Sequence, residues 1–146
     1  MIRRTAFTMI ELVFVIVVLG ILAAIAVPRL AATRDDAMIA KGKSDVSAIR
    51  AAIVSERQSR LLKGESNYIS KLDGKTTGVI FDGNDSTHSL LQYGITPESG
   101  KDGKWSGSNN SYTYQILGSG VAFTYTPATG LFDCDHTDSN CALLVQ

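Results

Sequence analysis

Hydrophobic residues form an almost unbroken run near the start of the chain. Residues 7–27 contain a single ionisable side chain, that of Glu11, and two arginines precede the run. A helix of this length covers about 30 Å, which matches the hydrocarbon core of a bilayer. A carboxylate at the centre of a bilayer costs about 2.5–3.5 kcal/mol on insertion scales, so an acid in such a run indicates a functional role. The pattern predicts a membrane-spanning helix whose function depends on the group that pairs with Glu11.

Beyond Pro28 the pattern becomes that of an amphipathic helix. Apolar residues recur there at helical spacing, and charged residues fill the other faces. The apolar residues of the predicted stripe are Met38, Ile39, Val46, Ile49 and Ile53, with Leu61 and Leu62 at its far end. Gly42 and Glu56 share a helical row with Ile49. Gly64 is placed to end the helix as a C-terminal cap. The two segments predict one helix of up to about 55 residues, loosened at Gly20, Pro28 and Gly42, where helix propensity is low.

The pattern of residues 65–111 is mixed. Residues 79–81 form a short apolar run that fits a strand, and residues 90–93 fit a helical turn. Residues 100–110 are mostly glycine, serine, asparagine and lysine around Trp105, which predicts a loop with one aromatic anchor.

From Ser111 onward apolar and polar residues alternate with a period of two. The alternating positions are Tyr112, Tyr114 and Ile116, then Val121, Phe123 and Tyr125, and a third run begins at Leu131 and Phe132. Turn residues separate the three runs, so they predict an antiparallel meander of three strands with one face against the amphipathic helix. The predicted fold class is α+β: a long N-terminal helix, membrane-spanning in its first half and amphipathic in its second half, packed on a small antiparallel β-sheet.

Charge and composition exclude several classes of function. The 14 basic and 14 acidic residues cancel and are spread along the chain, so there is no basic groove to favour nucleic acid. The tyrosines and Trp105 are therefore assigned to the sheet rather than to a platform for stacking DNA bases. His88 and His136 are far apart in the sequence and have no nucleophile in a recognisable setting. We expect a protein that is not an enzyme.

Two cysteines, Cys134 and Cys141, lie near the C-terminus. A hydrophobic N-terminus implies export, which permits a disulfide, and this pairing is favoured over two free thiols or half of a zinc site. Asp133, Asp135 and Asp138 flank the pair and are candidate ligands for Ca²⁺, although no bidentate glutamate follows them. No other cofactor is expected.

The N-terminus permits three interpretations. Arg3 and Arg4, the apolar run and a small-residue site before Val27 fit a secretory signal, but the run is long for that purpose and contains Glu11. A plain single-span anchor explains the length and leaves Glu11 without a purpose. The third interpretation rests on residues 6–12, AFTMIEL, and residues 19–28, LGILAAIAVP, which resemble the N-terminus of type IV pilins and type II secretion pseudopilins.

The resemblance implies a processing pathway and a role for each matching residue. In that family a prepilin peptidase removes a short basic leader immediately before a phenylalanine, and the new terminus is N-methylated. Cleavage would fall between Ala6 and Phe7, with methylation at Phe7. Glu11 would meet the N-terminal amine of a neighbouring subunit during assembly, and Pro28 matches the family's helix-kinking proline. Because the family usually has glycine where this chain has Ala6, we expect slower processing.

The same resemblance supplies expectations for organisation and partners. The expected segments are a leader at 1–6, a transmembrane and filament-core helix at 7–29, an amphipathic helix at 30–64, and a variable region, sheet and C-terminal disulfide loop at 65–146. The expected partners are related pilin subunits in a helical polymer, the prepilin peptidase, an inner-membrane assembly platform and membrane lipid. We expect an inner-membrane protein with a periplasmic domain that later enters a pilus or pseudopilus. The aromatic-proline segment typical of the major pseudopilin is not recognised, which favours a minor subunit. A non-polymerising anchored or secreted binding module is the alternative.

Overall fold

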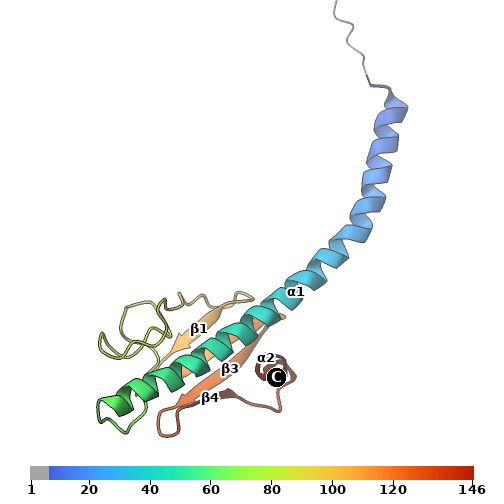
Figure 1. Ribbon diagram of the computed structural model, residues 1–146. Helices are drawn as coiled ribbons and strands as arrows, with labels where there is room; N and C mark the ends of the chain where they lie inside the picture. Colours follow the sequence, from blue (N-terminus) through green and yellow to red (C-terminus); the bar gives the residue numbers. More distant parts are fainter. Residues whose placement is uncertain (1–6) are drawn as a thin grey trace, which may run out of the picture. The chain divides into compact units, whose positions relative to one another are not determined.

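The computed structural model describes residues 7–146, apart from the side chains of Pro28 and Ala31. The chain divides into two compact units, Met1–Asp36 and Ala37–Gln146. Helix α1, Met9–Leu62, belongs in part to each unit. Four strands and a short helix complete the second unit, in the order β1 (Trp105–Ser108), β2 (Ser111–Ile116), β3 (Ser119–Thr126), β4 (Leu131–Cys134) and α2 (Ser139–Val145) (Figure 1).

Both ends of α1 carry capping residues that the sequence supplies. At the start, the Glu11 amide donates to Thr8 Oγ1 at 3.3 Å and the Leu12 amide donates to the Thr8 carbonyl at 3.2 Å. At the end, Gly64 has a φ of 83°, the Gly64 amide donates to the Leu61 carbonyl, and the Glu65 amide donates to the Arg60 carbonyl. These two bonds form a Schellman motif, which requires the left-handed conformation that glycine adopts at little cost. The predicted cap at Gly64 is confirmed.

The sheet is a four-stranded antiparallel meander with the strand order β1-β2-β3-β4. Two-residue turns join the first three strands. Asn109 and Asn110 have φ values of 53° and 70°, and Leu117 and Gly118 have values of 51° and 74°. Positive φ at both central residues is the feature of type I′ turns, whose twist matches that of the flanking strands.

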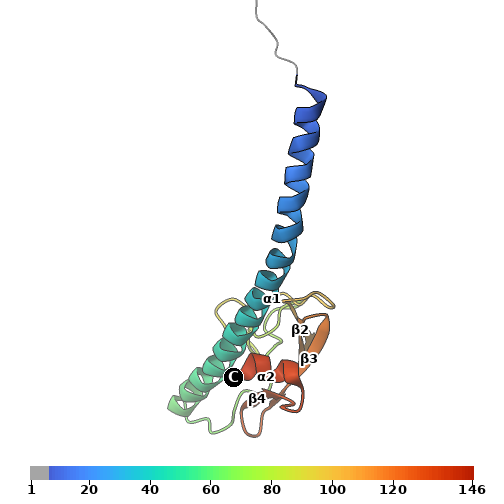
Figure 2. The same cartoon turned by 90° about the vertical axis from the view of Figure 1, so that its right-hand side faces the viewer.

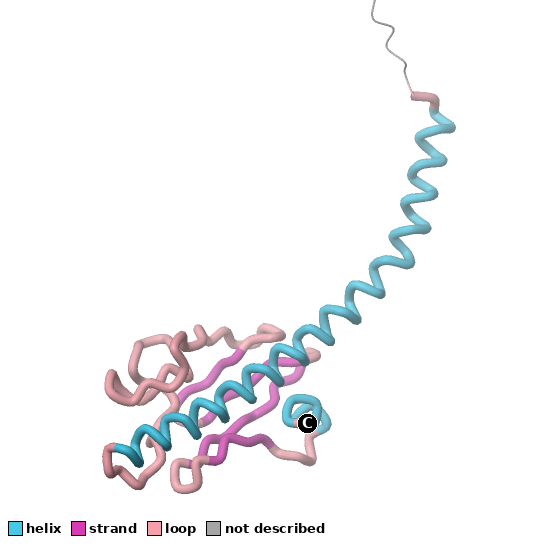
Figure 3. The backbone as a smooth tube through the Cα atoms, in the orientation of Figure 1, coloured by secondary structure: helices cyan, strands magenta, loops and turns pink. Residues whose placement is uncertain are grey.

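The part of α1 in the second unit packs across one face of the sheet (Figures 1 and 3). Its buried stripe follows spacings of four and three residues: Gly42, Val46, Ile49, Ile53, Glu56 and Arg60. The inward positions of the sheet supply the facing side chains, namely Trp105, Tyr112, Tyr114, Ile116, Val121, Phe123, Tyr125 and Phe132. The expected α+β fold, with the inward face of the sheet against the amphipathic helix, is confirmed.

Gly42 forms a notch in α1 that receives one ring and one aliphatic side chain. A Cβ atom at this position would lie 2.6 Å from Tyr114 Cε1 and 2.6 Å from Leu144 Cδ2. The Tyr114 hydroxyl donates to the Met38 carbonyl at 2.8 Å, so the ring is held against the helix. Burial raises the pKa of Tyr114 to about 12, and the charge of Asp45 adds to this shift. The notch therefore couples α1 to β2 and to α2 at one point.

Hydrogen bonds from neighbouring segments occupy backbone carbonyls at both edges of the sheet. On β4, Arg50 Nε donates to the Phe132 carbonyl at 3.0 Å. On β1, the Glu98 amide donates to the Trp105 carbonyl at 2.8 Å. Trp105 is also tied to α1, because its Nε1 donates to Asp45 Oδ2 at 3.0 Å. Each outer strand is thus fastened to a part of the chain outside the sheet.

Five local expectations were wrong. Residues 105–108 form strand β1 rather than part of a loop, so the sheet has four strands and not three. Leu61 and Leu62 are 52% and 92% exposed, because the buried stripe ends at Arg60 instead. Residues 79–81 make only an isolated bridge, from Ile80 to Ile95, and residues 90–93 are not helical. The expected C-terminal loop contains helix α2, which lies on the same side of the sheet as α1 (Figure 2).

Candidate assembly site

The first part of α1 exposes its apolar side chains on every face. Large hydrophobic residues from Phe7 to Leu30 are exposed, and Phe7 itself is 78% exposed. In length and composition α1 is able to cross a membrane, and none of the apolar window within it is buried in the described structure. Apolar surface of this extent on a helix requires a lipid or protein environment.

Glu11 lies in the first turn of this helix. It occupies the third helical position after Thr8, in the threonine-x-x-glutamate spacing of a capping box. A negative charge is stabilised there, because unpaired amides and the helix dipole make the N-terminus of a helix electropositive. Within residues 7–146 no ion pair reaches Glu11, and its side chain is exposed. The capping signal was present in the sequence, and its meaning for Glu11 was missed.

The other residues predicted to take part in processing and assembly are only partly covered. Ala6 lies outside the described residues, so the expected cleavage site is not described. Phe7 precedes the helix, four residues from Glu11. Pro28 lies inside α1, which continues through it.

The C-terminal residues form a stapled structure. Cys134 at the end of β4 and Cys141 in α2 are joined in a disulfide. Asp138 caps α2, since its side chain accepts the Asn140 amide at 2.9 Å. The disulfide and this cap hold α2 beside the sheet, with Leu144 in the core.

The three candidate calcium ligands are engaged separately. Asp133 Oδ1 accepts Arg50 Nη2 at 2.9 Å, and its Oδ2 lies 3.0 Å from His136 Nε2. Burial acts to raise the pKa of Asp133, but the hydrogen bonds from His136 and the Cys134 amide outweigh it and lower the pKa overall. Asp135 accepts the amide and hydroxyl of Thr137, which lower its pKa. Within residues 7–146 no group of three His, Cys, Asp or Glu side chains is arranged to hold a metal ion.

A charged network that the sequence did not predict lies at the end of α1. Arg60 Nε donates to Glu56 Oε1 at 3.0 Å, and its Nη1 donates to Glu65 Oε2 at 2.9 Å. His88 lies next to this pair: its Nε2 is 3.7 Å from Glu65 Oε2 and its Nδ1 is 2.9 Å from Asp85 Oδ1. The network fastens the loop of residues 83–89 to the helix, which is a structural role for His88.

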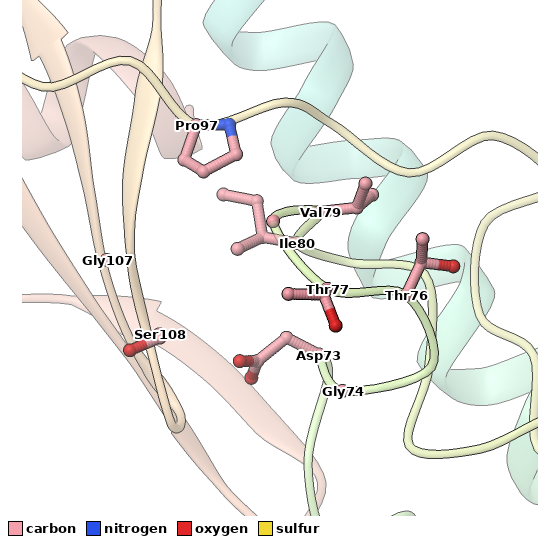
Figure 4. Close-up of a pocket in the computed structure, with 10 residues that line it drawn as sticks. Asp73, Gly74, Thr76, Thr77, Val79, Ile80, Pro97, Gly107 and Ser108 are labelled. Carbon is pink, nitrogen blue, oxygen red and sulfur yellow. The ribbon is translucent and has the colours of Figure 1, made fainter.

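Shallow pockets occur among the loops of the second unit. One of about 330 Å³ lies between residues 73–80, Pro97 and the end of β1, with Asp73 and Ser108 facing its open space (Figure 4). Asp73 is already engaged, because its Oδ1 accepts the Tyr112 hydroxyl at 2.6 Å and the Asn109 amide at 3.2 Å. Burial, strengthened by this bond to Asp73, raises the pKa of Tyr112 far above its usual range. Asp73 therefore ties this loop to the β1–β2 hairpin.

Comparison with known proteins found one informative relative. The chain is 43% identical over 51 residues to the "Type II secretion system core protein G" of Pseudomonas aeruginosa. The matched segment covers 35% of this chain and 36% of the relative, so the match spans about a third of either protein. No family model matches the chain, and no solved structure matches it. Together with the exposed apolar helix, this match supports the resemblance to the type IV pilin and pseudopilin family.

Proposed function

We propose that the chain is a structural, non-enzymatic subunit that polymerises into the pseudopilus of a type II secretion system. The observation that carries this proposal is the exposed apolar helix with a single acid in its first turn. A second domain packs independently of that segment, which suits a subunit that buries its helix in a filament and presents its sheet outside. The name of the relative favours the secretion pseudopilus over the adhesive pilus.

The proposed pathway begins in the inner membrane. The prepilin peptidase cuts between Ala6 and Phe7, and Phe7 is then N-methylated. Cleavage creates an α-amine four residues before Glu11, at the same end of the helix. In a surrounding of low dielectric, this amine on one subunit and the Glu11 carboxylate on its neighbour attract strongly, and either charge alone is costly. Pairing therefore favours the filament over the isolated subunit.

The proposed partners are related pilin subunits, the inner-membrane assembly platform and lipid. Before assembly the second unit faces the periplasm, and afterwards it lies on the surface of the filament. Within the filament we assign the chain to the minor subunits. Quantitative mass spectrometry of purified filaments tests that assignment, because a chain that makes up most of the protein contradicts it.

The mature N-terminus tests the pathway. Mass spectrometry of the protein from its native membrane is expected to find an N-methylated Phe7. A chain that starts at Val27 would indicate a secretory signal instead, and an intact Met1 would indicate a plain anchor.

Replacement of Glu11 tests assembly. Glu11→Ala is expected to leave the protein in the membrane fraction and to exclude it from sheared filaments, because the amine of the neighbour then has no partner. Asp35→Ala, which removes an acid beyond the apolar run, is the matched control and should enter filaments normally. Normal incorporation of the Glu11→Ala protein would refute the assembly role.

A further inference from the structure

A second shallow pocket, of about 340 Å³, lies on the second unit at the far end of α1. Three separate segments form it: α1, the chain that follows α1, and the turn between β3 and β4. Its lining residues are Arg57, Ser66, Asn67, Tyr68, Ser70, Pro127 and Ala128. The lining thus combines one cation, two hydroxyl groups, one amide and a tyrosine, and it includes no carboxylate.

Arg57 is held in a fixed orientation in this pocket. Its guanidinium carbon lies 4.5 Å from the centroid of the Tyr68 ring, the geometry of a cation–π contact. Tyr68 is fixed in turn, because its ring packs directly on Gly130, where a Cβ atom would overlap the ring. A guanidinium stacked in this way loses little further freedom when it binds a ligand.

Among the residues that the structure describes, no carboxylate neutralises the charge of Arg57. The two glutamates nearest to it in the sequence, Glu56 and Glu65, are both bound to Arg60. Within residues 7–146 Arg57 makes no ion pair, and its buried Nη1 has no hydrogen-bond partner. Arg57 therefore keeps its charge without a carboxylate partner among the described residues, and it presents that charge to the pocket that it lines.

The lining residues restrict the class of ligand. A guanidinium matches a carboxylate through two parallel hydrogen bonds. The hydroxyls of Ser66 and Ser70 and the amide of Asn67 both donate and accept, which suits a ligand with several hydroxyl groups. An anionic membrane surface would call for a cluster of Lys and Arg, and this pocket has one cation. The ligand that fits carries one carboxylate and several hydroxyls on a small ring.

We propose that this pocket binds a uronic acid, with Arg57 on the carboxylate and Ser66, Asn67 and Ser70 on the sugar hydroxyls. The site lies on the second unit, outside the apolar part of α1, and does not depend on polymerisation. It gives the exposed domain an affinity for acidic carbohydrate, either as the free sugar acid or as a residue of an acidic polysaccharide.

The experiment is a binding titration of the full chain in detergent micelles at low salt. The probes are galacturonic acid, trigalacturonic acid and the methyl ester of the trimer, which keeps the rings and removes the charge. Saturable binding of the acids and none of the ester is expected. A higher affinity for the trimer than for the monomer indicates that the natural ligand is an acidic polysaccharide. Equal affinity indicates that it is the free sugar acid. Both results support the site.

Variants distinguish binding in the pocket from nonspecific electrostatic attraction. Arg57→Met is expected to weaken binding by about 10- to 100-fold, the loss typical of a charge-assisted hydrogen bond. Lys63→Met removes an exposed cation near the same end of α1 that does not line the pocket, and should bind as the parent does. If Arg57→Met fails to fold, Arg57→Lys takes its place, since it keeps the charge and loses the planar fork, and it should also bind more weakly. Equal binding of acid and ester, no saturation, or unchanged binding by the folded Arg57 variant would each overturn the proposal.

Discussion

Replacement of Gly42 by alanine has two opposing effects on the stability of the protein. In an exposed helix this change is favourable by about 0.5–1 kcal/mol, because glycine loses more backbone entropy on folding. At Gly42 the added Cβ would lie 2.6 Å from both Tyr114 Cε1 and Leu144 Cδ2, so at least one of these groups must move. The Tyr114 hydroxyl is held by the Met38 carbonyl and Leu144 lies in a helix stapled by a disulfide, so neither moves freely.

Overpacking of this kind costs about 1–3 kcal/mol, which exceeds the gain in helix propensity. We therefore expect Gly42→Ala to lower the free energy of unfolding by up to about 2.5 kcal/mol after the propensity gain is subtracted. Urea unfolding of the full chain in detergent, followed by near-ultraviolet circular dichroism of the buried aromatics, measures this change. Ser47→Ala, at an exposed position of the same helix, should change it by less than about 0.5 kcal/mol.

A double variant tests whether the notch is the cause. In Gly42→Ala with Leu144→Ala, the loss should be smaller than the sum of the two single losses, because the truncated side chain leaves room for the new Cβ. If Gly42→Ala stabilises the protein by 0.5–1 kcal/mol, as propensity alone predicts, the reasoning from packing is refuted.

Three further perturbations follow from the buried groups. Glu56→Gln should destabilise the second unit by about 2–3 kcal/mol in the same urea assay, because Arg60 keeps Glu65 but loses the negative charge of its buried partner. A loss below about 0.5 kcal/mol would contradict this account. Replacing both Cys134 and Cys141 by serine should cost about 2–3 kcal/mol by releasing a short closed loop, and a reducing agent should then have no further effect on the variant. Tyr114 and Tyr125 have ordinary pKa values of 10.0 in the unfolded chain, and burial raises both pKa values to about 12 in the folded protein. The stability that these tyrosines contribute is therefore complete below pH 10 and is lost as pH rises towards 12. Tyrosinate absorbance should therefore rise together with unfolding in that interval, and independent titration of these tyrosines near pH 10 would contradict the burial argument.

The helix and the core of the sheet were predictable because their patterns are long. Spacings of three and four residues identified the stripe of α1, and alternation identified the inward rows of β2 and β3. The stripe was misread only at its end, where Arg60, paired with Glu56, is buried and the apolar Leu61 and Leu62 are exposed. The hydrophobicity pattern does not reveal a buried ion pair, because a charged residue considered alone is expected to be exposed.

Other elements depend on contacts between distant segments. Strand β1 has the sequence WSGS, which has little strand propensity apart from Trp105, and it forms because an Asn109–Asn110 turn brings it against β2. Helix α2 has seven residues, too few for a periodic signal, and is held by the disulfide and by Leu144 in the core.

The candidate sites show the same contrast. The apolar run and Glu11 were visible in the sequence. The capping spacing from Thr8 to Glu11 was visible too, but it was not recognised as a capping box. The pocket at Arg57 was not predictable, because its lining comes from three segments whose proximity is a property of the fold. Asp133, Asp135 and Asp138 were predicted as a group from closeness in sequence, and in the structure each carboxylate accepts hydrogen bonds from different partners.

The hydrogen bonds at the outer strands bear on how many copies of this chain can be crowded together. A free strand edge invites pairing with any other sheet, and such pairing has no fixed geometry or end point. Here Arg50 occupies a carbonyl of β4 and the Glu98 amide occupies a carbonyl of β1. These two carbonyls are therefore not available to a strand of another copy. In the proposed pseudopilus, self-recognition is then left to the apolar helix, which the same proposal places in the membrane before assembly.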